Sequence, residues 1–433
     1  MFRWRFLVLS VYNFFTRIIV RTFASEKQMY MVRYIGKVVF AALAVHAVLS
    51  CEVLDDDVDK HTSTGDSVCV ELNEIAEILA AVPLQQSHLK EVHKAVAASS
   101  LNGYDEEYTM KNLFDAPGTG VGDTQEEVLD SKSSDGVYLR DLIEDYVRNS
   151  GTKSGKRSIG PDEFLNALSA SDIQIYWPFS EDWDGETMPV ITFDPEDDSD
   201  ANIGYRLITN DDGSRYVEEV IVDEAMACDV PVWVVNRNSD AGFTTLEMLR
   251  REDPDWGEGG GTIIVKPKSK ASGETCKALM LKDFTMCRNY DSWFAGGSEF
   301  FVKTGSLDDF TASTEAELRL YNPLVTDFLI VVKRSQMGIP QPFNAVLVPE
   351  WNQKMTHCAF MITEDDGGTQ TEWKCTALVR IASKSYGVEM NLPFNTRDDI
   401  VWRGHLTNKW IEAYSNVTSN FGDISLTFEL VEY

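Results

Sequence analysis

Basic side chains are scarce in this chain of 433 residues, which contains 39 lysines and arginines but 69 aspartates and glutamates. Residues 1–50 hold seven of the basic residues and one acid, so the remaining chain carries 32 basic and 68 acidic side chains. A surface of this charge repels polyanions, which argues against nucleic acid or anionic lipid head groups as partners. Solubility is the simpler explanation of the acidity, and a divalent cation or cationic ligand is the alternative.

Recognisable catalytic motifs are also absent. The sequence contains no Gly-x-Ser-x-Gly elbow, His-Glu-x-x-His, Walker loop or dinucleotide fingerprint. Its six histidines are scattered, and none of its seven cysteines forms a Cys-x-x-Cys pair. The sequence therefore predicts no cofactor and identifies no catalytic residue.

Residues 38–50 are almost wholly apolar or small, with Arg33 and Lys37 before them and Cys51 directly after. This order of positive, apolar and small residues is typical of a secretory signal peptide, here residues 1–50. The Val48-Leu49-Ser50-Cys51 ending resembles the lipobox of bacterial lipoproteins, in which the cysteine becomes the lipidated first residue of the mature chain. The resemblance implies a lipid anchor on Cys51 in the outer membrane of the cell envelope, with the protein facing the exterior.

The extreme N-terminus is hydrophobic as well. Residues 2–23 are interrupted by Arg17 and Arg21, so they offer no uncharged run long enough to span a bilayer comfortably. A signal peptide that begins at Met29 or Met31 has the usual length, so we interpret residues 1–28 as an over-long translation start. A two-pass membrane anchor is the alternative.

An acidic segment follows the cysteine, and residues 51–66 are predicted to be an extended, solvated tether. The segment resembles the acidic export signal of surface-exposed lipoproteins of Bacteroidetes-type bacteria, although a plain acidic linker has the same composition. Residues 176–183 and 231–236 resemble an uncharacterised family of secreted proteins from the same bacterial group. That second resemblance implies no particular activity.

Residues 67–170 are predicted to be a helical region. Apolar residues recur at helical spacing on both sides of Pro83, which predicts two helices. A third helix is expected over about residues 138–147, and Pro161 in a first turn indicates another. Residues 171–319 are predicted to form a mixed, β-rich domain on the basis of several alternating or β-branched runs. These runs are residues 173–178, 190–193, 217–222 and 232–235.

Residues 320–433 are predicted to form an antiparallel β-sandwich, so the fold class is α+β. Residues 356–362 and 371–381 flank an Asp366-Gly367 pair, which is a strong signal for a two-residue hairpin. In that register Cys358 faces Cys375 at a position where paired Cα atoms lie about 4.5 Å apart, within reach of a disulfide. We therefore expect a Cys358–Cys375 disulfide, with two free buried thiols as the alternative.

One segment has a spacing that suggests calcium. Asp198, Asp200 and Asn202 occupy the first, third and fifth positions of an EF-hand loop. Ile203 replaces the turn glycine of that loop, however, and Thr209 stands where its bidentate glutamate is required. Turn formation is the better interpretation, and these three residues remain weak candidates for a metal site.

The sequence favours a non-catalytic, membrane-anchored envelope lipoprotein that binds a glycan or another envelope protein. The alternative is a surface hydrolase that acts on a polysaccharide or peptide through carboxylates. The abundance of acidic residues prevents the choice of a catalytic pair from sequence alone.

Overall fold

The computed structural model describes residues 70–432, apart from residues 132–135, 151–158, 198, 211–214, 239, 253–276, 308–309, 311 and 352. Residues Val68–Tyr433 form one compact unit. The predicted signal peptide, Cys51 and the acidic tether lie outside the described residues. Within the described ranges no helix is long and apolar enough to cross a membrane.

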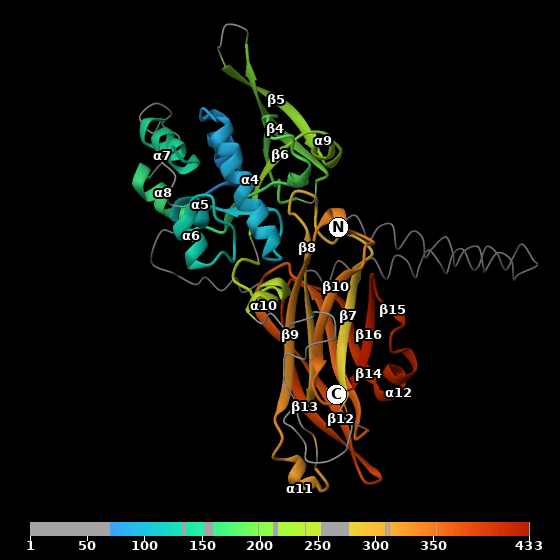
Figure 1. The fold of residues 1–433 in the computed structure, drawn as a ribbon. Coiled ribbons are helices and arrows are strands. Elements are labelled where there is room, and N and C mark those ends of the chain that lie inside the picture. The colour runs from blue at the N-terminus through green and yellow to red at the C-terminus, as the bar shows by residue number, and fades with distance from the viewer. Residues whose placement is uncertain are drawn as a thin grey trace, which may run out of the picture. The chain divides into compact units, whose positions relative to one another are not determined.

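The fold is α+β, as the sequence predicts. Helices and a mixed sheet form the N-terminal part of the compact unit, and antiparallel sheets form a sandwich in the C-terminal part (Figure 1). The mixed sheet has six strands in the order β1-β2-β6-β3-β4-β5, and only β3 and β6 pair in parallel. Its strands are β1 (Glu107–Thr109), β2 (Ile173–Tyr176), β3 (Val190–Phe193), β4 (Ala201–Thr209), β5 (Arg215–Asp223) and β6 (Val232–Arg237).

The helices of this part bury apolar stripes against the sheet and one another. In α3, Leu72, Ile75 and Leu79 are buried at helical spacing, and Pro83 follows the end of the helix. Pro161 occupies the first turn of α8, as predicted. The helices are α3 (Leu72–Ala81), α4 (Gln86–Leu101), α5 (Met110–Asp115), α6 (Gln125–Ser131), α7 (Leu139–Ser150), α8 (Pro161–Ser169), α9 (Glu224–Asp229) and α10 (Leu246–Glu252), with a 3₁₀ turn, η1 (Ser180–Asp182).

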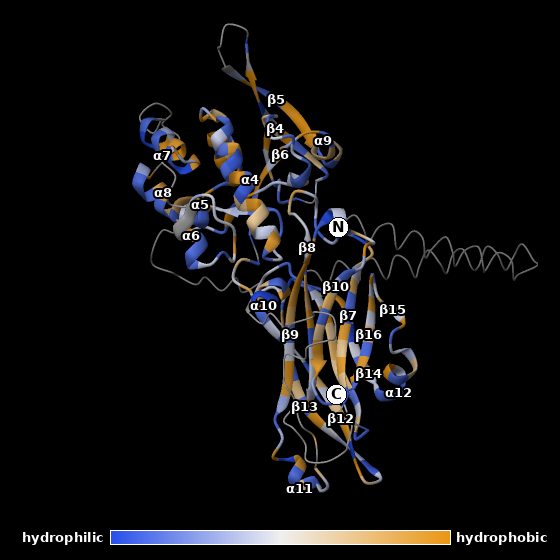
Figure 2. Cartoon of the chain, in the orientation of Figure 1, coloured by the Kyte–Doolittle hydropathy of each residue, from blue (hydrophilic) through white to orange (hydrophobic). Residues whose placement is uncertain are grey.

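The sandwich packs a four-stranded sheet, in the order β10-β7-β16-β15, against a sheet in the order β13-β12-β11-β8-β9, with β14 also paired to β11. Apolar side chains are concentrated along these strands (Figure 2), and buried residues such as Phe284, Phe300 and Phe360 fill the space between the sheets. Full burial of each such side chain contributes about 1.5–3 kcal/mol. The elements are β7 (Lys277–Met286), β8 (Ser298–Leu307), α11 (Glu315–Leu318), β9 (Pro323–Val332), η2 (Arg334–Gln336), β10 (Gln341–Val348), β11 (Met355–Glu364), β12 (Gln370–Ile381), β13 (Lys384–Asn395), β14 (Asp399–Thr407), α12 (Asn408–Tyr414), β15 (Thr418–Phe421) and β16 (Ile424–Glu432).

The β12–β13 hairpin adds a further layer. β12 pairs with β11 only at Met355 and His357, and the hairpin then packs on the face of β11 that points away from the sandwich core. The close approach depends on Gly305 of β8, where a Cβ would collide with Met390.

The expected Asp366-Gly367 hairpin and the Cys358–Cys375 disulfide are both wrong. β14 pairs with β11 along residues 357–364 and β8 pairs with it along residues 359–364, whereas β12 pairs with it only at Met355 and His357. Cys375 is therefore not opposite Cys358, and it lies beside Met390 of β13 instead. Cys358 lies in the sandwich core, whereas Cys375 packs on the opposite face of β11, and both are free thiols.

The boundaries between the parts also differ from those expected. β7 and β8, assigned to the mixed domain 171–319, pair within the sandwich, so the sandwich begins at Lys277 rather than at residue 320. β1, from the predicted helical region 67–170, pairs with β2 and belongs to the mixed sheet.

Candidate metal centre

Three carboxyl groups meet at one end of the sandwich. Glu364 ends β11 and lies opposite Phe300 of β8, so Glu299 of β8 is at the same end of the paired strands. The backbone N–H of Asp365 donates to the carbonyl oxygen of Glu299 at 3.0 Å, which keeps the strand ends together. Asp291 comes from the loop between β7 and β8. One ligand oxygen from each of Asp291, Glu299 and Glu364 lies within 4.8 Å of the others.

Glu364 is buried, and Asp291 and Glu299 are half-buried. Glu364 is 1% exposed, and its Oε1 and the Oδ2 of Asp291 have no hydrogen-bond partner among the described residues. Burial, and then the adjacent Asp291 carboxyl, raise the pKa of Glu364 to about 12. Burial also raises the pKa of Glu299 well above its usual range, and Asp291 and Asp240 raise it further. The group therefore needs either protons or a bound cation to remain stable.

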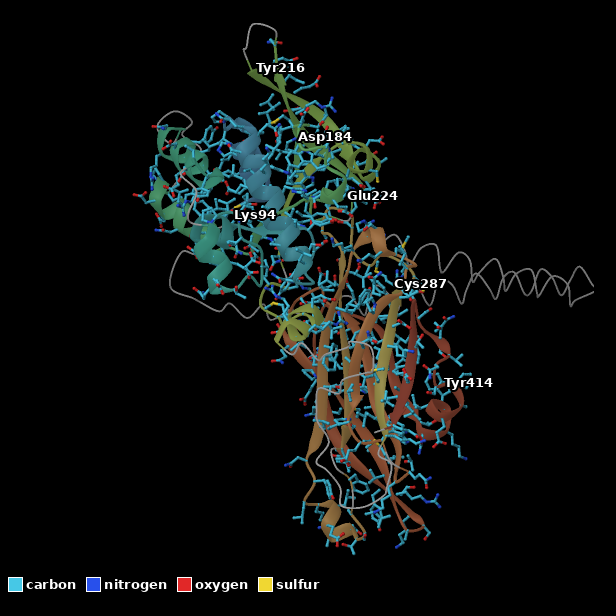
Figure 3. The ribbon with its side chains drawn as sticks, viewed as in Figure 1. Lys94, Asp184, Tyr216, Glu224, Cys287 and Tyr414 are labelled. Atoms are coloured by element: carbon cyan, nitrogen blue, oxygen red, sulfur yellow. The ribbon has the colours of Figure 1, made fainter. Side chains whose placement is uncertain are left out.

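A loop anchored by an arginine positions Asp291. Arg334 donates to the backbone carbonyl of Asp291 at 3.1 Å and to both carboxylate oxygens of Glu224, at 2.8 and 3.2 Å. Glu224 begins α9 (Figure 3), so this arginine connects the mixed-sheet part to the metal-binding loop. Burial still raises the pKa of Asp291, because its favourable contacts, including the charge of Arg334, offset only part of the desolvation.

The cavity next to this group extends into the mixed-sheet part and has a volume of about 460 Å³. Ten carboxyl side chains line it, against two guanidinium groups. Arg237 is already paired with Asp172 and Glu196, at 2.8 Å each, which leaves the cavity with a large excess of negative charge. The lining residues are Asp105, Glu107, Asp172, Gln174, Asp194, Glu196, Arg237, Asn238, Asp240, Phe243, Asp291, Ala295, Glu299, Asp365, Asp366, Gly367, Asn395 and Arg397.

Asp365, Asp366 and Gly367, which the sequence predicts to form a hairpin turn, line this cavity. The Oδ1 of Asp365 accepts from the backbone N–H of Gly367 at 3.0 Å and from the Asn395 amide at 3.1 Å. Burial and the surrounding carboxylates raise the pKa of Asp366 to about 6. Asp398, next to this segment, also has a pKa of about 6, chiefly because of burial.

Of the calcium candidates from the sequence, Asp200 and Asn202 are not among the residues that line this cavity. Asp198 lies outside the described residues. The amide of Asn202 is engaged locally, since it donates to the carbonyl of Phe193 at 2.8 Å and its Oδ1 accepts from the N–H of Ile203 at 2.8 Å. A site at Asp198, Asp200 and Asn202 stays a prediction, and turn formation accounts for the contacts of Asn202.

Comparison with known proteins adds no assignment, because no family model, no curated protein and no solved structure matches this chain.

Proposed function

We propose that this protein is a non-catalytic, lipid-anchored component of the outer membrane that binds calcium in its acidic cavity. Its folded part would contact a glycan or another envelope protein. The observation that carries the calcium proposal is the Asp291, Glu299 and Glu364 group, with its ligand oxygens within 4.8 Å of one another and two of its carboxylate oxygens unpartnered. Carboxylates in this arrangement are costly without a cation.

The chemistry of the group favours a hard cation such as calcium over zinc or copper. All three side chains offer oxygen, without the histidine or cysteine that zinc and copper prefer. Oxygens bound to one calcium ion at about 2.3–2.6 Å can lie up to roughly 5 Å apart, whereas the shorter bonds of magnesium, about 2.1 Å, restrict them to roughly 4 Å. The ligand oxygens of this group lie within 4.8 Å of one another, a spacing that a calcium ion accommodates.

The envelope location is supported by the sequence alone, through the apolar segment before Cys51 and the acidic residues after it. An extracellular site is compatible with calcium, since extracellular modules use weak carboxylate sites at millimolar calcium. The acidic surface disfavours nucleic acid as a partner.

Calorimetric titration of the chelator-treated protein with calcium tests the proposal. The wild type is expected to show saturable binding, and Glu299→Gln is expected to weaken it at least tenfold because one anionic ligand is lost. Glu389→Gln is a matched control, since Glu389 is exposed on β13. Equal binding by Glu299→Gln and wild type, or no binding by the wild type, would contradict the proposal.

A surface hydrolase is the second candidate, and one observation favours it. Asp366 lines the cavity with a pKa of about 6, a value that suits a general acid near neutral pH. A hydrolase would release reducing sugars from soluble polysaccharides, or peptides from casein, and Asp366→Asn would abolish the release. The absence of any release by the wild type from these substrates would favour the non-catalytic function.

A further inference from the structure

The part of the cavity formed by the mixed sheet contains a second pair of buried carboxyl groups. Glu107 begins β1 and Asp240 follows β6, and they are only 2% and 1% exposed. Both line the cavity. In the described part of the chain, the three side chains close enough to share one ion are Asp291, Glu299 and Glu364. Glu107 and Asp240 are separate from that group.

One amide fixes both carboxyl groups. The Nδ2 of Asn238 lies within hydrogen-bonding distance of Oε2 of Glu107 and Oδ1 of Asp240, at 3.0 Å in each case, and of Oε1 of Gln174, at 2.9 Å. The remaining oxygens, Oε1 of Glu107 and Oδ2 of Asp240, are buried and have no hydrogen-bond partner among the described residues. Buried polar atoms are rarely left unpartnered in folded proteins, so these two oxygens indicate a missing ligand.

The charges around the pair point to a cation rather than to a neutral donor. Burial, and then the Asp240 carboxylate, raise the pKa of Glu107 well above its usual range. Burial, and then Asp105, raise the pKa of Asp240 to about 7. The two groups thus repel each other when ionised, and a cation between their free oxygens would remove the repulsion.

We infer that Glu107 and Asp240 bind a second calcium ion in the cavity, held in position by Asn238. This inference rests on the proposed function, since it concerns the same cavity. Calcium takes six to eight oxygen ligands, so two protein side chains leave most positions to water. The second site is therefore weaker than the site at Asp291, Glu299 and Glu364, and repulsion from the first ion weakens it further.

Calcium content measured by atomic emission, after equilibrium dialysis against a calcium series at about pH 7.5, tests the inference. The wild type and the control Glu389→Gln are expected to bind two ions for each chain. Asp240→Asn, which preserves the shape of the side chain, is expected to bind one, with the weaker affinity reduced at least tenfold. Glu299→Gln is expected to lose the tighter ion and keep the ion held by Glu107 and Asp240.

The outcomes separate this inference from the proposed function. One ion in the wild type that is lost in Glu299→Gln but kept in Asp240→Asn overturns the second site and leaves the proposed function intact. No ion in the wild type overturns both. If Asp240→Asn does not fold, the wild-type ion count still decides, because a single ion at saturating calcium contradicts the inference.

Discussion

The carboxylate of Asp105 accepts a hydrogen bond of 2.6 Å from the backbone N–H of Gly297, which lies 192 positions later in the chain. Asp105 precedes β1 and Gly297 precedes β8, so this bond joins the mixed-sheet part to the sandwich beside the acidic cavity. Gly296 permits the approach, since its φ is 123° and a Cβ there would lie 2.7 Å from Oδ2 of Asp105.

Gly296→Ala is therefore expected to lower the free energy of unfolding by about 2 kcal/mol, through backbone strain and displacement of Asp105. Urea denaturation measures the change. Gly338→Ala is the matched control, because Gly338 also has a positive φ, 76°, but no atom within 4 Å of its added Cβ. An equal loss of stability in both variants would show that the positive φ alone causes the loss and that the close approach of Asp105 does not contribute.

Arg334→Gln is expected to lower the free energy of unfolding by about 2 kcal/mol and to weaken calcium binding. The side chain is 11% exposed and its loss leaves Glu224 and the carbonyl of Asp291 without their donor. Arg319→Gln, which breaks an exposed pair with Glu315, is expected to cost less than about 0.5 kcal/mol. Arg334→Gln with unchanged calcium affinity would mean that the arginine does not position the loop of Asp291.

The stability of the calcium-free protein is expected to fall as the pH rises. Asp366 and Asp240 have pKa values of about 6 and 7 in the folded protein, above the value of about 4 for an unfolded aspartate. The folded state therefore binds more protons than the unfolded state between about pH 4 and 7, and its stability decreases across that interval. Calcium bound at Asp240 displaces the proton of that group, and its charge favours the ionised form of Asp366, so its stabilising effect should be larger at about pH 8 than at about pH 5.

Urea midpoints at the two pH values, with chelator and with millimolar calcium, measure this dependence. The double variant Asp366→Asn with Asp240→Asn should show a weaker pH dependence without calcium, because two of the groups no longer titrate. A pH dependence as strong as that of the wild type would assign the effect to other groups.

Both thiols of the predicted disulfide should react as free cysteines. Under denaturing conditions without reductant, Cys358 and Cys375 are each expected to take up one alkyl group, because they lie on opposite faces of β11. In the native protein Cys358 should stay unlabelled, since it is fully buried. Peptide mass spectrometry measures the alkylation of both cysteines. A pair of peptides joined by a Cys358–Cys375 disulfide would contradict this arrangement.

Local patterns predict much of this fold. The apolar spacing on either side of Pro83 correctly predicts α3 and α4, and the run from Ile173 correctly predicts β2. The Asp366-Gly367 turn fails because a hairpin signal is local, whereas the position of β11 is set by its distant partners β8 and β14.

The metal centre is not predictable from the sequence. Its residues come from a loop, from the second residue of one strand and from the end of another, so no spacing connects Asp291, Glu299 and Glu364. Among so many acidic residues, this group is distinguished by three ligand oxygens within 4.8 Å of one another and by the unpartnered oxygens of Asp291 and Glu364. Neither property leaves a local signal in the sequence.

Proton release on calcium binding tests the central claim most directly. Glu364 has a pKa of about 12 without a cation, so it holds a proton at neutral pH that calcium must displace. Calorimetric titrations at about pH 7.5 in buffers of different ionisation enthalpy should give a binding heat that varies with the buffer and corresponds to at least one released proton. A binding heat independent of the buffer, or no binding heat at all, would contradict a calcium ion held by these buried carboxyl groups.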